Sequence, residues 1–319
     1  MGYTPIRINT IRPDKALSFS LFIFFQERYL RYFDIGKSIP TDLFGKLKRQ
    51  KIARFYIEDK DESKYQKFVD EILEGLADRQ DISVEEKAAV ASDSACTAVD
   101  RMQKDPTSQV AFKMTENAAK SLRAVISKNP TALKSIFGKK ASEDDAVIKH
   151  CLNVSALATK LAQKEKCTDK EIDDIAVAGL LHDLGVSRFS DDKKPLFFKN
   201  RKDFTVDDIK FYTNHPQTIV GLLQDRPYIN KDILNLILNY SENMAGEGNN
   251  KKLKPSKLEE ILSLVNCYDK RMITQKLSPG EAIKDILMKE IGKYDLNLIN
   301  KLKTLLQEEG VLDIKELQE

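Results

Sequence analysis

Helix-start signals constrain the fold of this chain more than any other feature of its sequence. Three segments place Ser or Thr three residues before Glu, the pattern of a capping box, in which the two residues satisfy free N–H groups at a helix start. They are residues 168–171, 256–259 and 278–281, the last with Pro279 at the first helical position. From about Ser83 onward such signals recur and strand-like runs vanish. This part of the chain is therefore predicted to be all helical.

The first 80 residues differ from the rest in their pattern of residue types. Runs rich in β-branched and aromatic residues, separated by proline and glycine, predict strands at 6–8, 17–25, 29–33 and 54–57. Thr41 can cap a helix to about Gln50, and apolar residues at helical spacing predict another over 62–76. The predicted fold class is α+β: a small α+β module over 1–80 and a large helical domain over 84–319, with a boundary near 78–84.

Composition narrows the class of protein. Hydrophobic residues make up 41% of the 319 residues and charged residues 32%, which is typical of a soluble protein with a core. The net charge is +3, and residues of both signs are interspersed. The sequence therefore lacks the strong excess of basic residues that is typical of a nucleic-acid binder. The four cysteines lie far apart without CxxC spacing, which indicates reduced thiols and a cytoplasmic protein. The most apolar stretch, 17–25, is too short for membrane insertion.

Only three histidines occur, His150, His182 and His215, and Asp183 follows the second. Imidazole nitrogen and carboxylate oxygen are ligands that suit iron, manganese, nickel and zinc. Three unrelated core histidines are the alternative interpretation. Local context favours a metal site. His150 falls on the buried face of a predicted helix, and Pro216 interrupts the helix beside His215, where functional ligands often occur.

The remaining context concerns helix ends and oxygen ligands. His182 and Asp183 are expected to close a helix, with Gly185 suited to the left-handed position just beyond it. Asn266 and Asp269 share a polar strip on the helix predicted from Ser256. Either can supply an oxygen ligand, and a solvated helical pair is an equal alternative.

This ordered set resembles the HD superfamily of metal-dependent phosphohydrolases, and more narrowly the HD-GYP group of cyclic di-GMP phosphodiesterases. The likeness covers about residues 85–310 and includes an HDxG signature at 182–185. The other segments that carry it are 150–154, 195–199, 205–208, 215–221, 242–248, 268–269 and 277–282.

The resemblance implies an HD-type helical domain with two divalent ions, iron or manganese. One ion would bind His150, His182, Asp183 and Asn266, and a second would lie between Asp183 and His215. Water, or a shifted Asp269 or Glu242, would complete the shell. Asp183 would also act in catalysis as the bridging carboxylate.

The implied function is hydrolysis of cyclic di-GMP, or a related cyclic dinucleotide, by water activated between two ions. Signalling proteins are the expected protein partners. Four basic residues are candidates for phosphate contacts or, alternatively, solvated surface: Arg188, Lys199, Arg271 and Lys276.

The chain also departs from the group's pattern. Tyr240 and Ser241 stand in place of two adjacent histidine ligands, 249–250 is Asn-Asn in place of Tyr-Pro, and Val186 replaces a lysine. Ala146 replaces a carboxylate that some three-metal members have, so a three-metal centre is not expected. These departures leave two alternatives open: a degenerate member acting as a cyclic-dinucleotide or metal-binding receptor or scaffold, and an HD phosphohydrolase for another nucleotide.

Overall fold

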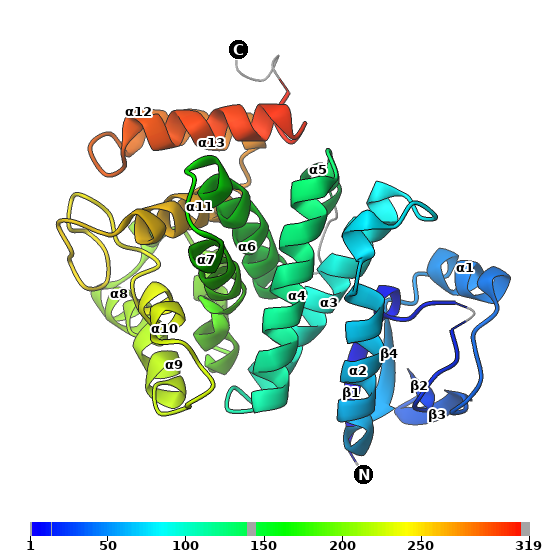
Figure 1. Ribbon diagram of the computed structural model, residues 1–319. Helices are drawn as coiled ribbons and strands as arrows, with labels where there is room; N and C mark the ends of the chain where they lie inside the picture. Colours follow the sequence, from blue (N-terminus) through cyan, green and yellow to red (C-terminus); the bar gives the residue numbers. More distant parts are fainter. Residues whose placement is uncertain (1, 14, 139–144, 314–319) are drawn as a thin grey trace.

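The computed structural model describes residues 2–13, 15–138 and 145–313, and it confirms the α+β class (Figure 1). A small sheet lies at one end of the molecule, and helices form the rest. The four antiparallel strands have the spatial order β1-β4-β2-β3. The elements of this part are β1 (Tyr3–Arg7), β2 (Leu21–Phe25), β3 (Arg28–Phe33), α1 (Thr41–Arg49), β4 (Arg54–Glu58) and α2 (Glu62–Leu73).

Alternating burial explains the pairing of β1 with β4. β1 pairs with β4 from Tyr3 opposite Glu58 to Arg7 opposite Arg54. Ile6 of β1 is 1% exposed, because alternate side chains of a strand point to the same face and this face meets the core.

Several predicted boundaries in this part were wrong. The first strand is Tyr3–Arg7 rather than 6–8, and the second helix ends at Leu73 rather than at 76. The second strand begins at Leu21, because Leu17 exchanges backbone hydrogen bonds with Gly36 and Lys37 outside the sheet ladder. Thr41 is the first residue of α1, and Pro40 takes the capping position.

The described residues after 83 contain no strand, as predicted. All three predicted capping boxes are formed, and Thr205 makes a fourth with Asp208. The helices are α3 (Val84–Lys104), α4 (Gln109–Lys128), α5 (Ala132–Phe137), α6 (Ala146–Lys164), α7 (Asp169–Leu181), α8 (Val206–Thr213), α9 (His215–Leu223), α10 (Lys231–Leu238), α11 (Lys257–Thr274), α12 (Pro279–Lys289) and α13 (Leu296–Glu308).

A close crossing of α6 and α7 sets the geometry of the helical part. A Cβ atom on Gly179 of α7 would lie 2.6 Å from the Cα atom of Ser155 on α6, so only glycine permits this approach. The Ser155 hydroxyl also donates to the carbonyl of Ala176 at 2.7 Å. α11 packs against the same helix, α6, and this brings three distant segments of the sequence together.

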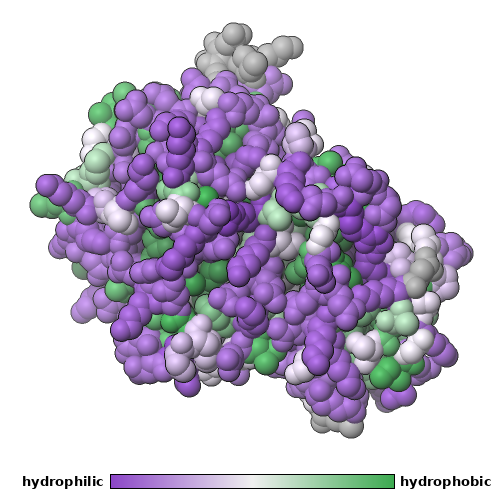
Figure 2. Space-filling view, viewed as in Figure 1, coloured by the Kyte–Doolittle hydropathy of each residue, from purple (hydrophilic) through white to green (hydrophobic). Residues whose placement is uncertain are grey.

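The hydrophobic core runs without interruption from the sheet into the helices, including Phe55 of β4 and Val99 of α3. The division into domains at 1–80 and 84–319 stays a prediction. The visible surface is mainly hydrophilic, with an apolar patch where Figure 1 places β2 and β3 (Figure 2). Among the described residues, no helix combines the length and the apolar character that crossing a membrane requires.

Candidate metal centre

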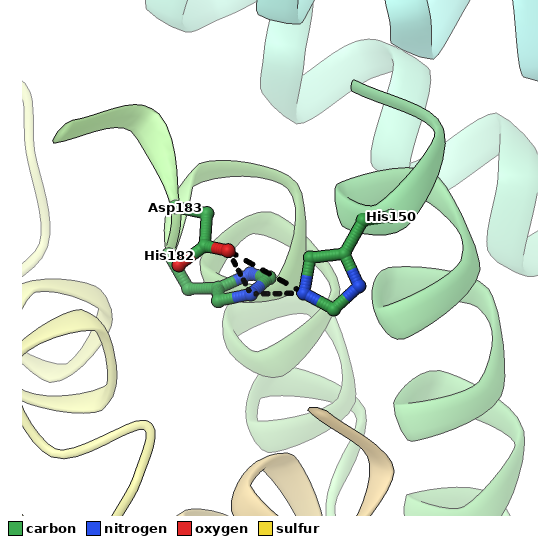
Figure 3. A group of neighbouring side chains, drawn as sticks. All are labelled: His150, His182 and Asp183. Atoms are coloured by element: carbon green, nitrogen blue, oxygen red, sulfur yellow. Dashed lines mark hydrogen bonds and ion pairs between the residues drawn. The ribbon is translucent and has the colours of Figure 1, made fainter. Parts of the chain in front are cut away.

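His150, His182 and Asp183 meet at the crossing of α6 and α7 (Figure 3). His150 lies in the first half of α6, His182 caps the C-terminal end of α7, and Asp183 follows it. The two Nε2 atoms are 3.1 Å apart, and Asp183 Oδ2 lies 3.5 Å from His150 Nε2 and 3.7 Å from His182 Nε2. All three side chains are fully buried. Three of the residues predicted to bind a metal therefore converge.

The other ring nitrogens show which tautomers are present. His182 Nδ1 lies 2.8 Å from the carbonyl oxygen of Gly179, which can only accept, so Nδ1 carries the proton. Burial lowers the pKa of His182 to about 4, and the ring is neutral at pH 7. His150 Nδ1 donates to Asp269 Oδ2 at 2.6 Å. His182 Nε2 consequently presents a lone pair toward His150 Nε2.

The donor set fits a divalent metal ion. Asn266 directs its Oδ1 to His150 Nε2 at 3.0 Å, so two nitrogen and two oxygen atoms gather at one place. Asp183 Oδ2 is fully buried, and a buried carboxylate needs a positive charge nearby. Mixed nitrogen and oxygen ligands suit a divalent transition metal. These four residues fit such an ion.

His215 stands on the other side of Asp183. It begins α9, and its Nδ1 donates to the Tyr212 carbonyl at 2.5 Å. Its Nε2 lies 3.2 Å from Asp183 Oδ1, so the two oxygens of this carboxylate face different histidines. Asp183 is thus placed between the two predicted ion positions.

Gly185 serves a purpose other than the predicted one. Its φ angle is not positive, and it lies in a 3-10 turn (Leu184–Arg188), so the left-handed position was wrong. A Cβ atom there would lie 2.7 Å from the carbonyl oxygen of His215. Glycine is needed for the close passage of this second segment of chain.

The remaining two candidates for the metal shell lie elsewhere. Asp269 contacts the ring nitrogen of His150 that points away from His182, and it also accepts from Asn153 Nδ2 at 2.9 Å. It holds the imidazole in place, as an outer partner of a metal ligand does. Glu242 is fully buried and accepts the backbone N–H groups of Asn250 at 2.6 Å and Lys252 at 2.7 Å. Glu242 therefore holds the loop of residues 246–255 in place through these two hydrogen bonds.

Sequence reasoning missed Lys270. Its Nζ lies 3.3 Å from Asp183 Oδ2, donates to the Tyr212 hydroxyl at 3.1 Å and sits 3.2 Å from the centre of the Phe197 ring. Burial lowers the pKa of Lys270 to about 8, against the attraction of Asp183. Burial alone would raise the pKa of Asp183, but Lys270 and the three histidines together outweigh it and hold that pKa well below its usual value. The one sequence signal was its position four residues after Asn266, on the same helix face.

Two cavities flank the centre. One, of about 490 Å³, is lined by Tyr240, Asn266 and Lys270 at the centre and by Lys199 farther out. The other, of about 720 Å³, is lined by His215, Gly185 and the predicted Arg188.

The other two predicted phosphate contacts are less favourably placed. Arg271 faces the smaller cavity but is paired with Asp285 at 2.7 Å and with Glu290. Lys276 is exposed and lines neither cavity.

Comparison with known proteins places this site in a family. The HD domain family model matches residues 113–298, more than half of the chain, and the chain belongs to this family. Membership implies that the chain binds a divalent metal ion.

Two individual proteins are similar. A cyclic di-GMP phosphodiesterase, PA4108 of Pseudomonas aeruginosa, is 28% identical over 127 residues, which is 40% of this chain and only 30% of the relative's length. The solved structure of Bd1817, an HDG"Y"P protein from Bdellovibrio bacteriovorus, has the same fold with a TM-score of 0.76 and 22% identity. That match covers 96% of this chain and 100% of the other. The predicted resemblance to the HD-GYP group is confirmed by the three findings together.

Proposed function

We propose that this chain is a metal-dependent phosphodiesterase that hydrolyses cyclic di-GMP, or a related cyclic dinucleotide, to the linear dinucleotide. The observation that carries the proposal is the convergence of His150 Nε2 and His182 Nε2 with the buried Asp183 Oδ2. The substrate class comes from the name of the Pseudomonas aeruginosa relative.

The proposed cofactors are two divalent ions, iron or manganese. His150, His182, Asp183 and Asn266 would hold the first, and the second would lie between Asp183 and His215. Such ions supply Lewis acidity toward a phosphate oxygen and lower the pKa of water. Asp183 orients both positions through its two oxygens, while the Nδ1 hydrogen bonds keep each imidazole turned inward.

The smaller cavity suits a ligand with bases and phosphates. The half-buried Phe204 lines it and offers a ring on which a base can stack. Arg201 and Lys202 stand at its lining and form no ion pair with a described carboxylate, so both are free to meet phosphate oxygens.

A second candidate function is supported by Tyr240. This residue stands where the resemblance expects a histidine ligand, and its hydroxyl lies 3.4 Å from His215 Nε2. Burial raises the pKa of Tyr240 well above its usual value, which keeps the phenol neutral and a poor ligand. A second ion would then have few protein ligands, and the chain would act as a cyclic-dinucleotide receptor that has lost turnover.

A turnover assay separates the two functions. Protein loaded with ferrous iron under reducing conditions is incubated with cyclic di-GMP, and the products are separated by chromatography. The proposal expects the linear dinucleotide from the wild type and from Asp225→Ala, an exposed control, and none from Asp183→Ala. Binding without turnover would support the receptor. If the protein neither bound nor hydrolysed cyclic di-GMP, both functions would be overturned.

A further inference from the structure

Lys270 lies between the carboxylate of Asp183 and the smaller of the two cavities. Its Nζ lies 3.3 Å from Asp183 Oδ2, and its side chain is 17% exposed while that of Asp183 is 0% exposed. The Phe197 ring and the Tyr212 hydroxyl provide its other contacts. The ammonium group therefore bridges the buried carboxylate and the 490 Å³ cavity.

The same carboxylate oxygen is a ligand of the candidate metal centre. Asp183 Oδ2 faces His150 Nε2 and His182 Nε2, where the first ion would bind. An ammonium ion and a divalent ion on one oxygen repel each other strongly in a buried site. Binding of the metal consequently requires that Lys270 move away from Asp183.

The cavity is the open direction for that movement, and two of the other cations that line it are neutralised by carboxylates. Arg271 pairs with Asp285 and Glu290, and Lys293 pairs with Glu247 at 2.6 Å and Glu290 at 3.0 Å. Lys270 has no such second carboxylate in its ion pairs. Once it is displaced, its ammonium is an unpaired charge beside the metal centre, and a phosphate oxygen is the natural partner.

We propose that Lys270 has two positions: paired with Asp183 in the metal-free protein, and turned into the cavity to bind a phosphate oxygen of the ligand once a metal ion occupies Asp183. The ligand's identity rests on the proposed function, whereas the competition with the metal does not. Lys270 is then a substrate-contacting residue that also lowers the affinity for metal.

Two binding measurements on Lys270→Met test the proposal, because it predicts changes of opposite sign. Affinity for Mn²⁺, measured by competition with a chelator, should rise about 10-fold, the size of effect that outer partners of ligands typically have. Affinity of the Mn²⁺-loaded protein for inorganic phosphate, measured by calorimetry, should fall about 10-fold or more, because a charged hydrogen bond is lost. A merely structural lysine would not strengthen metal binding when removed.

Controls keep the outcomes distinct. Lys270→Arg keeps the charge and should leave both affinities near wild type, and Lys120→Met removes an exposed lysine of α4 and should change neither. Lys270→Gln repeats the test if the methionine variant does not fold. Weaker or unchanged Mn²⁺ binding, or unchanged phosphate binding, would overturn the proposal. Absence of cyclic di-GMP turnover by the wild type would refute only the phosphodiesterase function.

Discussion

The crossing of α6 and α7 can be tested at Gly179, where the two backbones approach most closely. In Gly179→Ala the new Cβ atom would lie 2.6 Å from Ser155 Cα, 2.9 Å from its nitrogen and 3.1 Å from its Cβ. Ordinary carbon contacts lie at about 3.5–4.0 Å, so the helices must separate by about 1 Å. The nearest atoms are backbone and cannot rotate away.

The magnitude follows from two opposing effects. Inserting a methyl group into a packed site costs about 1–3 kcal/mol, and contact with backbone puts this site at the upper end. Alanine in a helix regains about 1 kcal/mol over glycine. The free energy of unfolding should therefore fall by about 2 kcal/mol, which corresponds to a decrease in Tm of about 3 °C for a chain of this length. Mn²⁺ affinity should fall too, because the crossing helices carry His150 and His182.

Gly221→Ala is the matched control. Gly221 lies on the exposed face of α9, and a Cβ atom there would meet nothing within 4 Å. Alanine should raise the free energy of unfolding by about 1 kcal/mol through helix propensity alone. Thermal unfolding followed by circular dichroism at 222 nm measures both variants. If Gly179→Ala were as stabilising as Gly221→Ala, the argument from the close crossing would be refuted.

Two further predictions concern the surroundings of the centre. Asp269→Asn removes the charge behind His150 Nδ1, and Mn²⁺ affinity should fall about 10- to 100-fold while the fold is kept; unchanged affinity in a chelator competition would contradict the positioning role. Burial raises the pKa of Cys96 to about 12 and that of Cys151 well above its usual value. Iodoacetamide at pH 8 should therefore modify neither thiol until urea unfolds the protein, whereas the partly exposed Cys167 should react first; labelling of Cys151 in the native protein, seen by peptide mass spectrometry, would contradict its burial.

The parts of the fold that sequence predicted are those decided by residues close in the chain. Capping boxes at Thr168, Ser256 and Ser278 need only four consecutive residues, and all three are formed. Gly185 shows the limit of such reasoning. Its local context indicates a left-handed helix end, but the actual requirement is the passage of His215, a neighbour 30 residues later that no local pattern reveals.

Lys270 was beyond prediction for a related reason. A lysine on an amphipathic helix is usually solvated, and a spacing of four residues from Asn266 does not by itself indicate that this one is buried. Its burial depends on Phe197 and Tyr212, which belong to other elements. Asp183, its ion-pair partner, was predicted as a metal ligand, but the lysine beside it follows only from the packing of α11 against the site.

The three histidines differ in whether residues close in the sequence set the orientation of the imidazole ring. This difference explains why the sequence predicted only part of the site. The last carbonyl groups of a helix lack intrahelical donors. His182 Nδ1 uses the carbonyl three residues before it, at the end of α7, and His215 Nδ1 uses the carbonyl three residues before it, at the end of α8. Each helix end thus fixes a tautomer and turns Nε2 toward Asp183.

His150 cannot use this arrangement, because it lies within α6, where the carbonyl groups are already engaged in the helix. Its Nδ1 depends instead on Asp269 of α11, 119 residues later. Two of the three imidazoles are therefore oriented as soon as their helices end, whereas the third is oriented only when α11 packs against α6. It follows that substitution of Asp269 should disturb the metal centre through His150, and that Asp269, although it lies behind the ring, controls whether this imidazole is oriented toward the centre.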